Sequence, residues 1–160
     1  NTAATLRAAP FIVNNDITID QIHTEITTAG TAGALCRMGI YRDNGNTYPQ
    51  SLVTGSDVGT FTGDAAAVKT NTFGSPIKLQ KGLYWLAQAC GTVTTQPTYR
   101  SVAVGAIPPV LGYLSTMGAS QYGTGWTVAF TFAALPTSYP AGGTILANTA
   151  VPAIQVRITG

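Results

Sequence analysis

The chain has 160 residues, of which 45% are hydrophobic but only 9% are charged, and its formal net charge is +2. This composition suits one globular domain and excludes an intrinsically disordered chain, which combines high charge with low hydrophobicity. The basic residues are scattered and no apolar run is long enough to span a bilayer, so we expect neither a nucleic-acid-binding face nor membrane insertion.

Short strand patterns follow one another along the chain, with turn residues between them. The pattern slips near Asp20, which indicates a β-bulge, and one short helical turn is predicted between residues 108 and 117. The predicted strands cover residues 11–13, 17–26, 35–41, 58–62, 67–72, 77–79, 83–93, 100–104, 126–132 and 154–158. The pattern predicts an all-β chain, a single antiparallel β-sandwich of jelly-roll-like form over residues 1–160, with residues 1–10 as an extended connecting segment.

The strongest strand pattern reads GLYWLAQA and begins at Gly82. Side chains alternate across a strand, so Trp85 shares one face with Leu83 while Tyr84 and Leu86 share the other. One of these faces must pack on the core, and we expect it to be the face that carries Trp85.

The only two cysteines, Cys36 and Cys90, both fall in predicted strands. They would pair if those strands were neighbours. We expect free thiols instead, because a domain of this size does not require a disulfide.

No Asp, Glu, Lys, Arg or His occurs between Arg100 and Arg157. Either this stretch is kept soluble by uncharged polar side chains, or part of it is buried against another subunit, since interface cores lose charge. For the second alternative, Leu114 and Phe132 are the candidate interface residues.

The residues of common catalytic sites are scarce. His23 and Glu25 lie on one face of a predicted strand and would be the only acid–base pair, although such pairs are usually just exposed polar side chains. No Gly-X-Ser-X-Gly elbow, phosphate-binding glycine loop or zinc ligand set is present. We therefore expect no catalysis, no cofactor and no metal site.

The stretch GIYRDNGNTYPQSLV, residues 39–53, passes from a strand into a cluster of Asp and Asn around Gly45. Such residues make an ordinary turn. Two alternatives are a sugar-contacting loop, in which Tyr48 stacks on a sugar ring, and a calcium loop, although the later acidic ligand of an EF-hand is missing.

Several segments together resemble the C-terminal β-sandwich domains of bacteriophage tail and receptor-binding proteins. The similar segments are the Gly-Ile-Tyr strand and its turn at residues 39–45, Pro-X-X-Leu-Val at 49–53, Gly-X-Tyr-Trp-Leu-Ala at 82–87, the Leu-Pro pair at 135–136 and the final Val-X-Ile strand at 156–158. Residues 107–125 take no part in the resemblance.

The resemblance implies the C-terminal domain of a longer tail protein in the virion, at the tail tip or fibre. It also implies a homotrimer that contacts other phage tail proteins and binds host cell-surface polysaccharide without catalysis. The candidate ligand-binding residues are Asp43, Asn44, Asn46, Tyr48, Tyr113, Tyr122 and Trp126. The alternatives are a structural trimerising or tail-decorating domain without a ligand, and a carbohydrate-binding module appended to a hydrolase.

Overall fold

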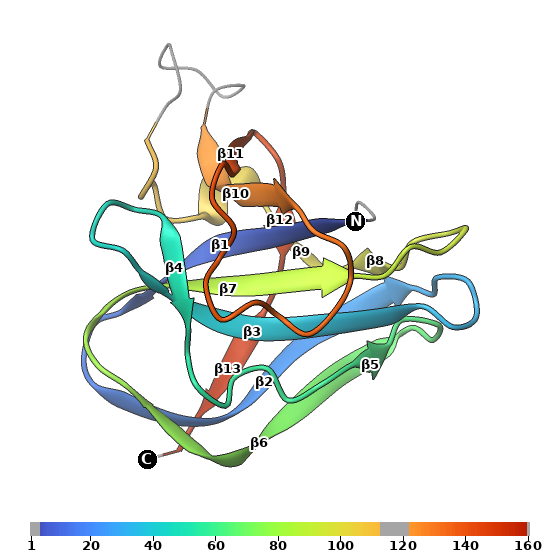
Figure 1. Ribbon diagram of the computed structural model, residues 1–160, viewed down its shortest axis with the longest axis horizontal. Helices are drawn as coiled ribbons and strands as arrows, with labels where there is room; N and C mark the ends of the chain where they lie inside the picture. The colour runs from blue at the N-terminus through green and yellow to red at the C-terminus, as the bar shows by residue number, and fades with distance from the viewer. Residues whose placement is uncertain (1–3, 113–121, 160) are drawn as a thin grey trace.

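The computed structural model describes residues 4–112 and 122–159, and in them the predicted all-β antiparallel sandwich is confirmed (Figure 1). The only helix in these ranges is a single 3₁₀ turn, η1, at Val104–Ala106, just before the predicted helical turn. No helix within them is long and apolar enough to cross a membrane. The strands are β1 Thr5–Val13, β2 Ile17–Thr28, β3 Leu35–Asp43, β4 Pro49–Leu52, β5 Phe61–Thr62, β6 Ala67–Leu79, β7 Gly82–Cys90, β8 Thr98–Tyr99, β9 Ser101–Val102, β10 Gly123–Ala129, β11 Thr144–Ala147, β12 Val151–Pro152 and β13 Gln155–Ile158.

The larger sheet has the order β11-β10-β1-β7-β3-β4, with β5 also paired to β3. Its three long central strands, β1, β7 and β3, run across the middle of Figure 1. The expected connecting segment is therefore wrong, because residues 5–10 belong to one of these central strands. Proline has no backbone N–H to donate, so it fits best where a strand has a neighbour on one side only. β1 pairs with β10 only as far as Ala8, so at Pro10 its only partner is β7.

The smaller sheet has the order β13-β2-β6, with β8 also paired to β2, and lies below the larger sheet in Figure 1. The predicted bulge is confirmed, since the register between β2 and β6 shifts between Ile19 and Gln21. At this shift residues 73–76 continue the neighbouring strand, so the two strands predicted at 67–72 and 77–79 are one strand, β6. A third, two-stranded sheet pairs β12 with β9.

Both faces of the larger sheet are buried. The first core fills the space between the larger sheet and the smaller sheet and includes Ile22, Met38, Ile40 and Leu86. The second core lies on the opposite face and contains Trp85, which is fully buried as predicted. The other face of β7 is buried as well, in the first core, because both faces of this sheet are covered: residues 130–143 lie over what would otherwise be the solvent face.

We call residues 130–143 the covering loop; it is the orange segment that crosses in front of β7 and β3 in Figure 1. Two tyrosine hydroxyls anchor it, since Tyr41 donates to the Pro136 carbonyl at 2.8 Å and Tyr139 donates to the Leu6 carbonyl at 2.9 Å. The loop lies so close to β3 that a Cβ on Gly39 would be 2.5 Å from Leu135 Cδ1. A larger residue at Gly39 would therefore force the Leu135 side chain to move.

The uncharged stretch thus folds largely onto its own chain. Ile107, Leu135, Tyr139, Leu146 and Val151 are all buried within it. This packing explains part of the missing charge without a second subunit. Whether the rest of the stretch forms an interface stays a prediction.

The expectation of free thiols is wrong, because Cys36 and Cys90 form a disulfide. The two residues lie directly opposite each other on the neighbouring strands β3 and β7, with their Cα atoms 4.1 Å apart. The bridge is buried in the first core beside the Tyr99 hydroxyl. Chain length alone was a poor guide here, because strand adjacency decides whether two cysteines meet.

Candidate functional site

The Asp-Asn-Gly-Asn segment after β3 is a turn held together by its own side chains. Asp43 Oδ2 accepts hydrogen bonds from the backbone N–H groups of Gly45 at 2.7 Å and Thr47 at 3.3 Å. Its other oxygen, Oδ1, accepts from Trp85 Nε1 at 2.8 Å. Asn44 Oδ1 accepts from the N–H groups of Asn46 and Tyr48. The turn interpretation is confirmed, and both Asp43 oxygens accept hydrogen bonds, Oδ2 within the turn and Oδ1 from β7.

The calcium alternative finds no support in this geometry. Asp43 is the only acid in the turn, and its carboxylate already accepts three hydrogen bonds. Across residues 4–112 and 122–159 there is no group of three His, Cys, Asp or Glu side chains that could hold a metal ion.

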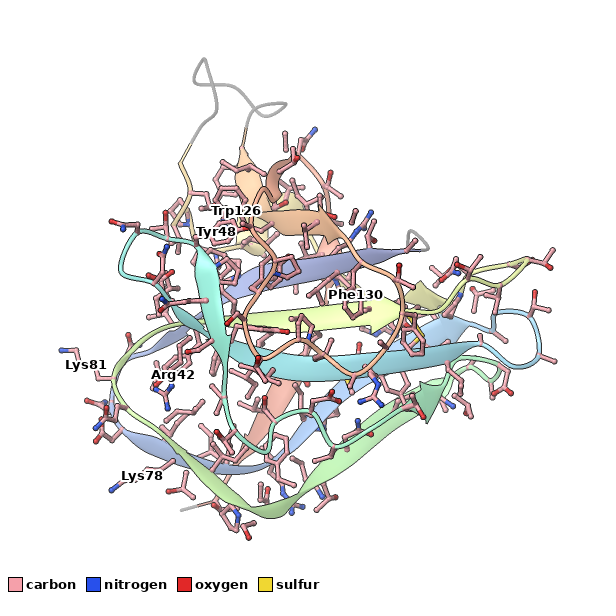
Figure 2. The ribbon with its side chains drawn as sticks, in the orientation of Figure 1. Arg42, Tyr48, Lys78, Lys81, Trp126 and Phe130 are labelled. Carbon is pink, nitrogen blue, oxygen red and sulfur yellow. A yellow bond between two sulfur atoms is a disulfide. The ribbon has the colours of Figure 1, made fainter. Side chains whose placement is uncertain are left out.

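The turn is fixed against an aromatic cluster from distant parts of the chain. The Tyr48 ring meets the Trp126 ring of β10 edge to face, with centroids 4.8 Å apart, and the Tyr139 ring at 5.7 Å. Trp126 Nε1 donates to the Thr47 carbonyl at 2.8 Å. The Tyr48 hydroxyl donates to the Pro140 carbonyl at 2.6 Å and accepts from Gly143 N–H at 3.0 Å. Figure 2 shows Tyr48 and Trp126 close together at the upper end of the sandwich.

These contacts define the Tyr48–Trp126 site, which consists of Asn44, Asn46, Tyr48 and Trp126. The two rings are half-buried, whereas the two asparagines are exposed beside them. The hydrogen bonds that Asn46 makes to described residues come from its backbone, so its amide faces solvent. The site thus places apolar ring surface beside amide groups that can form hydrogen bonds, a combination found in small-molecule binding sites.

The other predicted site residues do not join this cluster. Tyr122 donates to the Ile107 carbonyl and packs on a separate small core with Leu146 and Val151. Phe132 lies in the covering loop and packs on the second core. Tyr113 and Leu114 lie outside the described residues.

His23 and Glu25 do face the same hollow on the smaller sheet, which measures about 190 Å³. Arg100 forms a bidentate ion pair with the Glu25 carboxylate. This guanidinium lowers the pKa of Glu25, which is the opposite of what a general acid near neutral pH requires. The arrangement therefore suits a surface ion pair better than an acid–base pair.

The sequence interpretation missed one polar pair between the sheets. Arg7 of β1 lies directly opposite Gln88 of β7, and Gln88 is only 3% exposed. Gln88 stands at a core-facing position of the strongest strand pattern in the chain. A polar residue at an otherwise apolar position could have indicated this buried polar pair from the sequence.

The fold and the Tyr48–Trp126 site define an antiparallel β-sandwich with two half-buried aromatic rings beside exposed amides. The chain matches no family model, and neither a curated protein nor a solved structure shows significant similarity to it.

Proposed function

We propose that this chain is the receptor-binding domain of a bacteriophage tail protein and binds host cell-surface carbohydrate without catalysis. The observation that carries the proposal is the Tyr48–Trp126 site, together with the resemblance described above. The disulfide is in keeping with a protein that works outside a reducing compartment, as a virion protein does.

The site has the parts that carbohydrate recognition uses. The exposed part of an aromatic ring can pack on the apolar face of a sugar, and the Asn44 and Asn46 amides can bond its hydroxyl groups. The turn is held in place before any ligand arrives, by Asp43 on one side and Trp126 on the other. Little conformational entropy would then be lost on binding.

Replacing Trp126 by Ala should weaken binding to host cell-wall polysaccharide about tenfold or more, since truncating a central aromatic residue often costs more than 1 kcal/mol. Asn46→Ala should weaken it too, while leaving the melting temperature unchanged because that amide does not hold the turn. Binding would be measured by calorimetry or sedimentation with purified polysaccharide.

Phe130→Ala is the matched control for this experiment. Phe130 is also a half-buried aromatic residue on the second core, and Figure 2 shows it away from Tyr48 and Trp126. The proposal for this site fails if Trp126→Ala and Phe130→Ala bind polysaccharide equally well. A parent protein that binds no host polysaccharide would favour the structural role instead.

An apolar groove on the surface supports the expected homotrimer, because contact with another subunit would cover it. The groove measures about 320 Å³ and has no charged residue in its lining. It runs between β1 and the uncharged stretch, where Ile12 is 46% exposed beside Val102, Ile107 and Ile154. We propose that this groove is part of the contact between subunits. Three copies of the Tyr48–Trp126 site would then add avidity to weak sugar binding.

Ile12→Asp should dissociate the trimer, because a charge buried at an apolar contact has no partner there. Light scattering coupled to gel filtration would measure the mass, with Val68→Asp as control because Val68 is 64% exposed on β6, on the other sheet. Phe132→Asp is a poorer test, since Phe132 packs on the core of its own chain. A parent protein that is monomeric at high concentration would contradict the trimer.

A further inference from the structure

A change of partner along one edge of β2 opens a hollow in the smaller sheet. On this edge β2 pairs with β13 as far as His23 and with β8 from Ile26 onward, while β6 occupies the opposite edge. At Thr24 and Glu25, between the two partners, neither β13 nor β8 pairs with β2. The hollow lies at this gap and measures about 190 Å³.

Polar side chains on the outer face of the smaller sheet line this hollow. Ile22 and Ile26 of β2 are buried in the first core, so the alternation of the strand turns His23 and Glu25 to the outer face. Gln155 of β13 lies directly opposite His23 and therefore shares that face. Among the described residues, the His23 ring and the Gln155 side-chain amide have no hydrogen-bond partner. Both groups are available to a ligand in the hollow.

An ion pair fixes the other side of the hollow. Arg100 donates from Nε to one Glu25 carboxylate oxygen and from Nη2 to the other, the second bond at 2.9 Å. The backbone N–H of Arg100 also bonds the Glu25 carbonyl at 2.9 Å. The side-chain hydrogen bonds lower the pKa of Glu25, so the pair stays charged near neutral pH. Arg100 Nη1 takes no part in the pair and remains a donor.

The groups around the hollow fit an uncharged ligand with several hydroxyls. With His23 neutral at pH 7, the formal charges of Arg100 and Glu25 cancel, so neither an anion nor a cation is attracted overall. A hydroxyl both donates and accepts, and the Gln155 amide and the neutral imidazole each offer a donor and an acceptor. Val68, which is 64% exposed, adds apolar surface to the lining. The hollow has roughly six times the 30 Å³ that one water occupies, which is enough for about one sugar unit.

We propose that this hollow binds one uncharged sugar unit, held by Gln155 and His23 on one side and by the Arg100–Glu25 pair on the other. It lies on the smaller sheet, whereas the Tyr48–Trp126 site lies beside the second core on the larger sheet. The inference rests on the proposed carbohydrate-binding function and adds a second sugar site to each chain. Two sites in one chain would raise the avidity for a polysaccharide that repeats the same unit.

The competing explanation is that these side chains only keep the outer face of the sheet in contact with water. Polar side chains are usual on the solvated face of an antiparallel sheet, and an exposed ion pair contributes little to stability. Under this explanation no sugar would bind at the hollow, and removing one of its charges would create no preference among sugars.

The first test titrates the unmodified protein with methyl glucoside, methyl galactoside and methyl mannoside, followed by NMR. At least one of them should shift the signals of the His23 ring and the Gln155 side-chain amide. The signals of Asn46 and Trp126 report the Tyr48–Trp126 site separately, so either site can fail without the other. Unchanged His23 and Gln155 signals with all three glycosides would overturn the proposal.

The second test removes one hydrogen-bonding group. Gln155→Ala should weaken binding of that glycoside about fivefold to tenfold, the usual effect of losing one hydrogen bond. Asn15→Ala is the matched control, because it removes an exposed amide from the turn between β1 and β2, outside the lining of the hollow. It should leave binding unchanged, and equal effects of the two substitutions would overturn the site.

The third test removes the negative charge with Glu25→Gln. In the parent protein, the uronide of the same sugar, which differs only in its carboxylate, should bind no more tightly than the uncharged glycoside. In the variant Arg100 has no counter-charge, so the uronide should bind about tenfold more tightly than the uncharged glycoside. The melting temperature would show that the variant is folded. A parent protein that prefers the uronide, or a folded variant with no change of preference, would overturn the proposal.

Discussion

Replacing Trp85 by Ala should lower the free energy of unfolding by about 3–5 kcal/mol, which is the cost of truncating a large aromatic residue in a core. Trp85 is 0% exposed and packs in the second core beneath the covering loop. The variant also loses the hydrogen bond from Nε1 to Asp43. Chemical denaturation followed by circular dichroism would measure the loss.

Trp85→Phe separates the two contributions. It keeps a buried ring but removes the donor to Asp43, so its cost should be smaller than that of Trp85→Ala. Because Asp43 also holds Gly45 and Thr47, both variants should loosen the turn and weaken carbohydrate binding. A Trp85→Ala variant that melts within a degree or two of the parent would show that the second core contributes little.

Removing the disulfide should cost about 4 kcal/mol, the loop-closure value for this separation. The bridge joins residues 54 positions apart, so the unfolded chain gains much conformational freedom when it is absent. The double variant Cys36→Ala/Cys90→Ala would be compared with the parent by chemical denaturation.

Reductant provides the control for this prediction. It should destabilise the parent as much as the double substitution does, and should not affect the double variant. The unfolded parent should contain no titratable thiol until reductant is added. Two thiols found without reductant would contradict the bridge.

Much of the secondary structure is determined locally. Alternating β-branched residues predicted β2, including its bulge near Asp20, because side chains on a strand repeat every two residues. The turn after β3 was predicted from Asp and Asn beside Gly45, since these residues hydrogen-bond their own backbone. The burial of Trp85 was predicted from its place in β7, but the burial along this strand does not alternate, because every residue from Tyr84 to Cys90 is buried.

The Tyr48–Trp126 site was predicted only in part. Tyr48 and Trp126 were both named as candidates, but nothing in the sequence showed that residues 78 positions apart would meet edge to face. Tyr122 was named on the same grounds and instead supports a different core. An aromatic residue in a sequence indicates a possible contact, and its partner depends on how the strands are paired.

The tertiary structure alone decided which strands are neighbours. It placed β1 at the centre of the larger sheet, brought Cys36 opposite Cys90, and laid the covering loop over Trp85. The physical reason is that the local pattern of a strand specifies which side chains share a face but not which strand lies beside it. Strand order and register depend on contacts between distant segments, whose free energy is set by the packing of the whole chain.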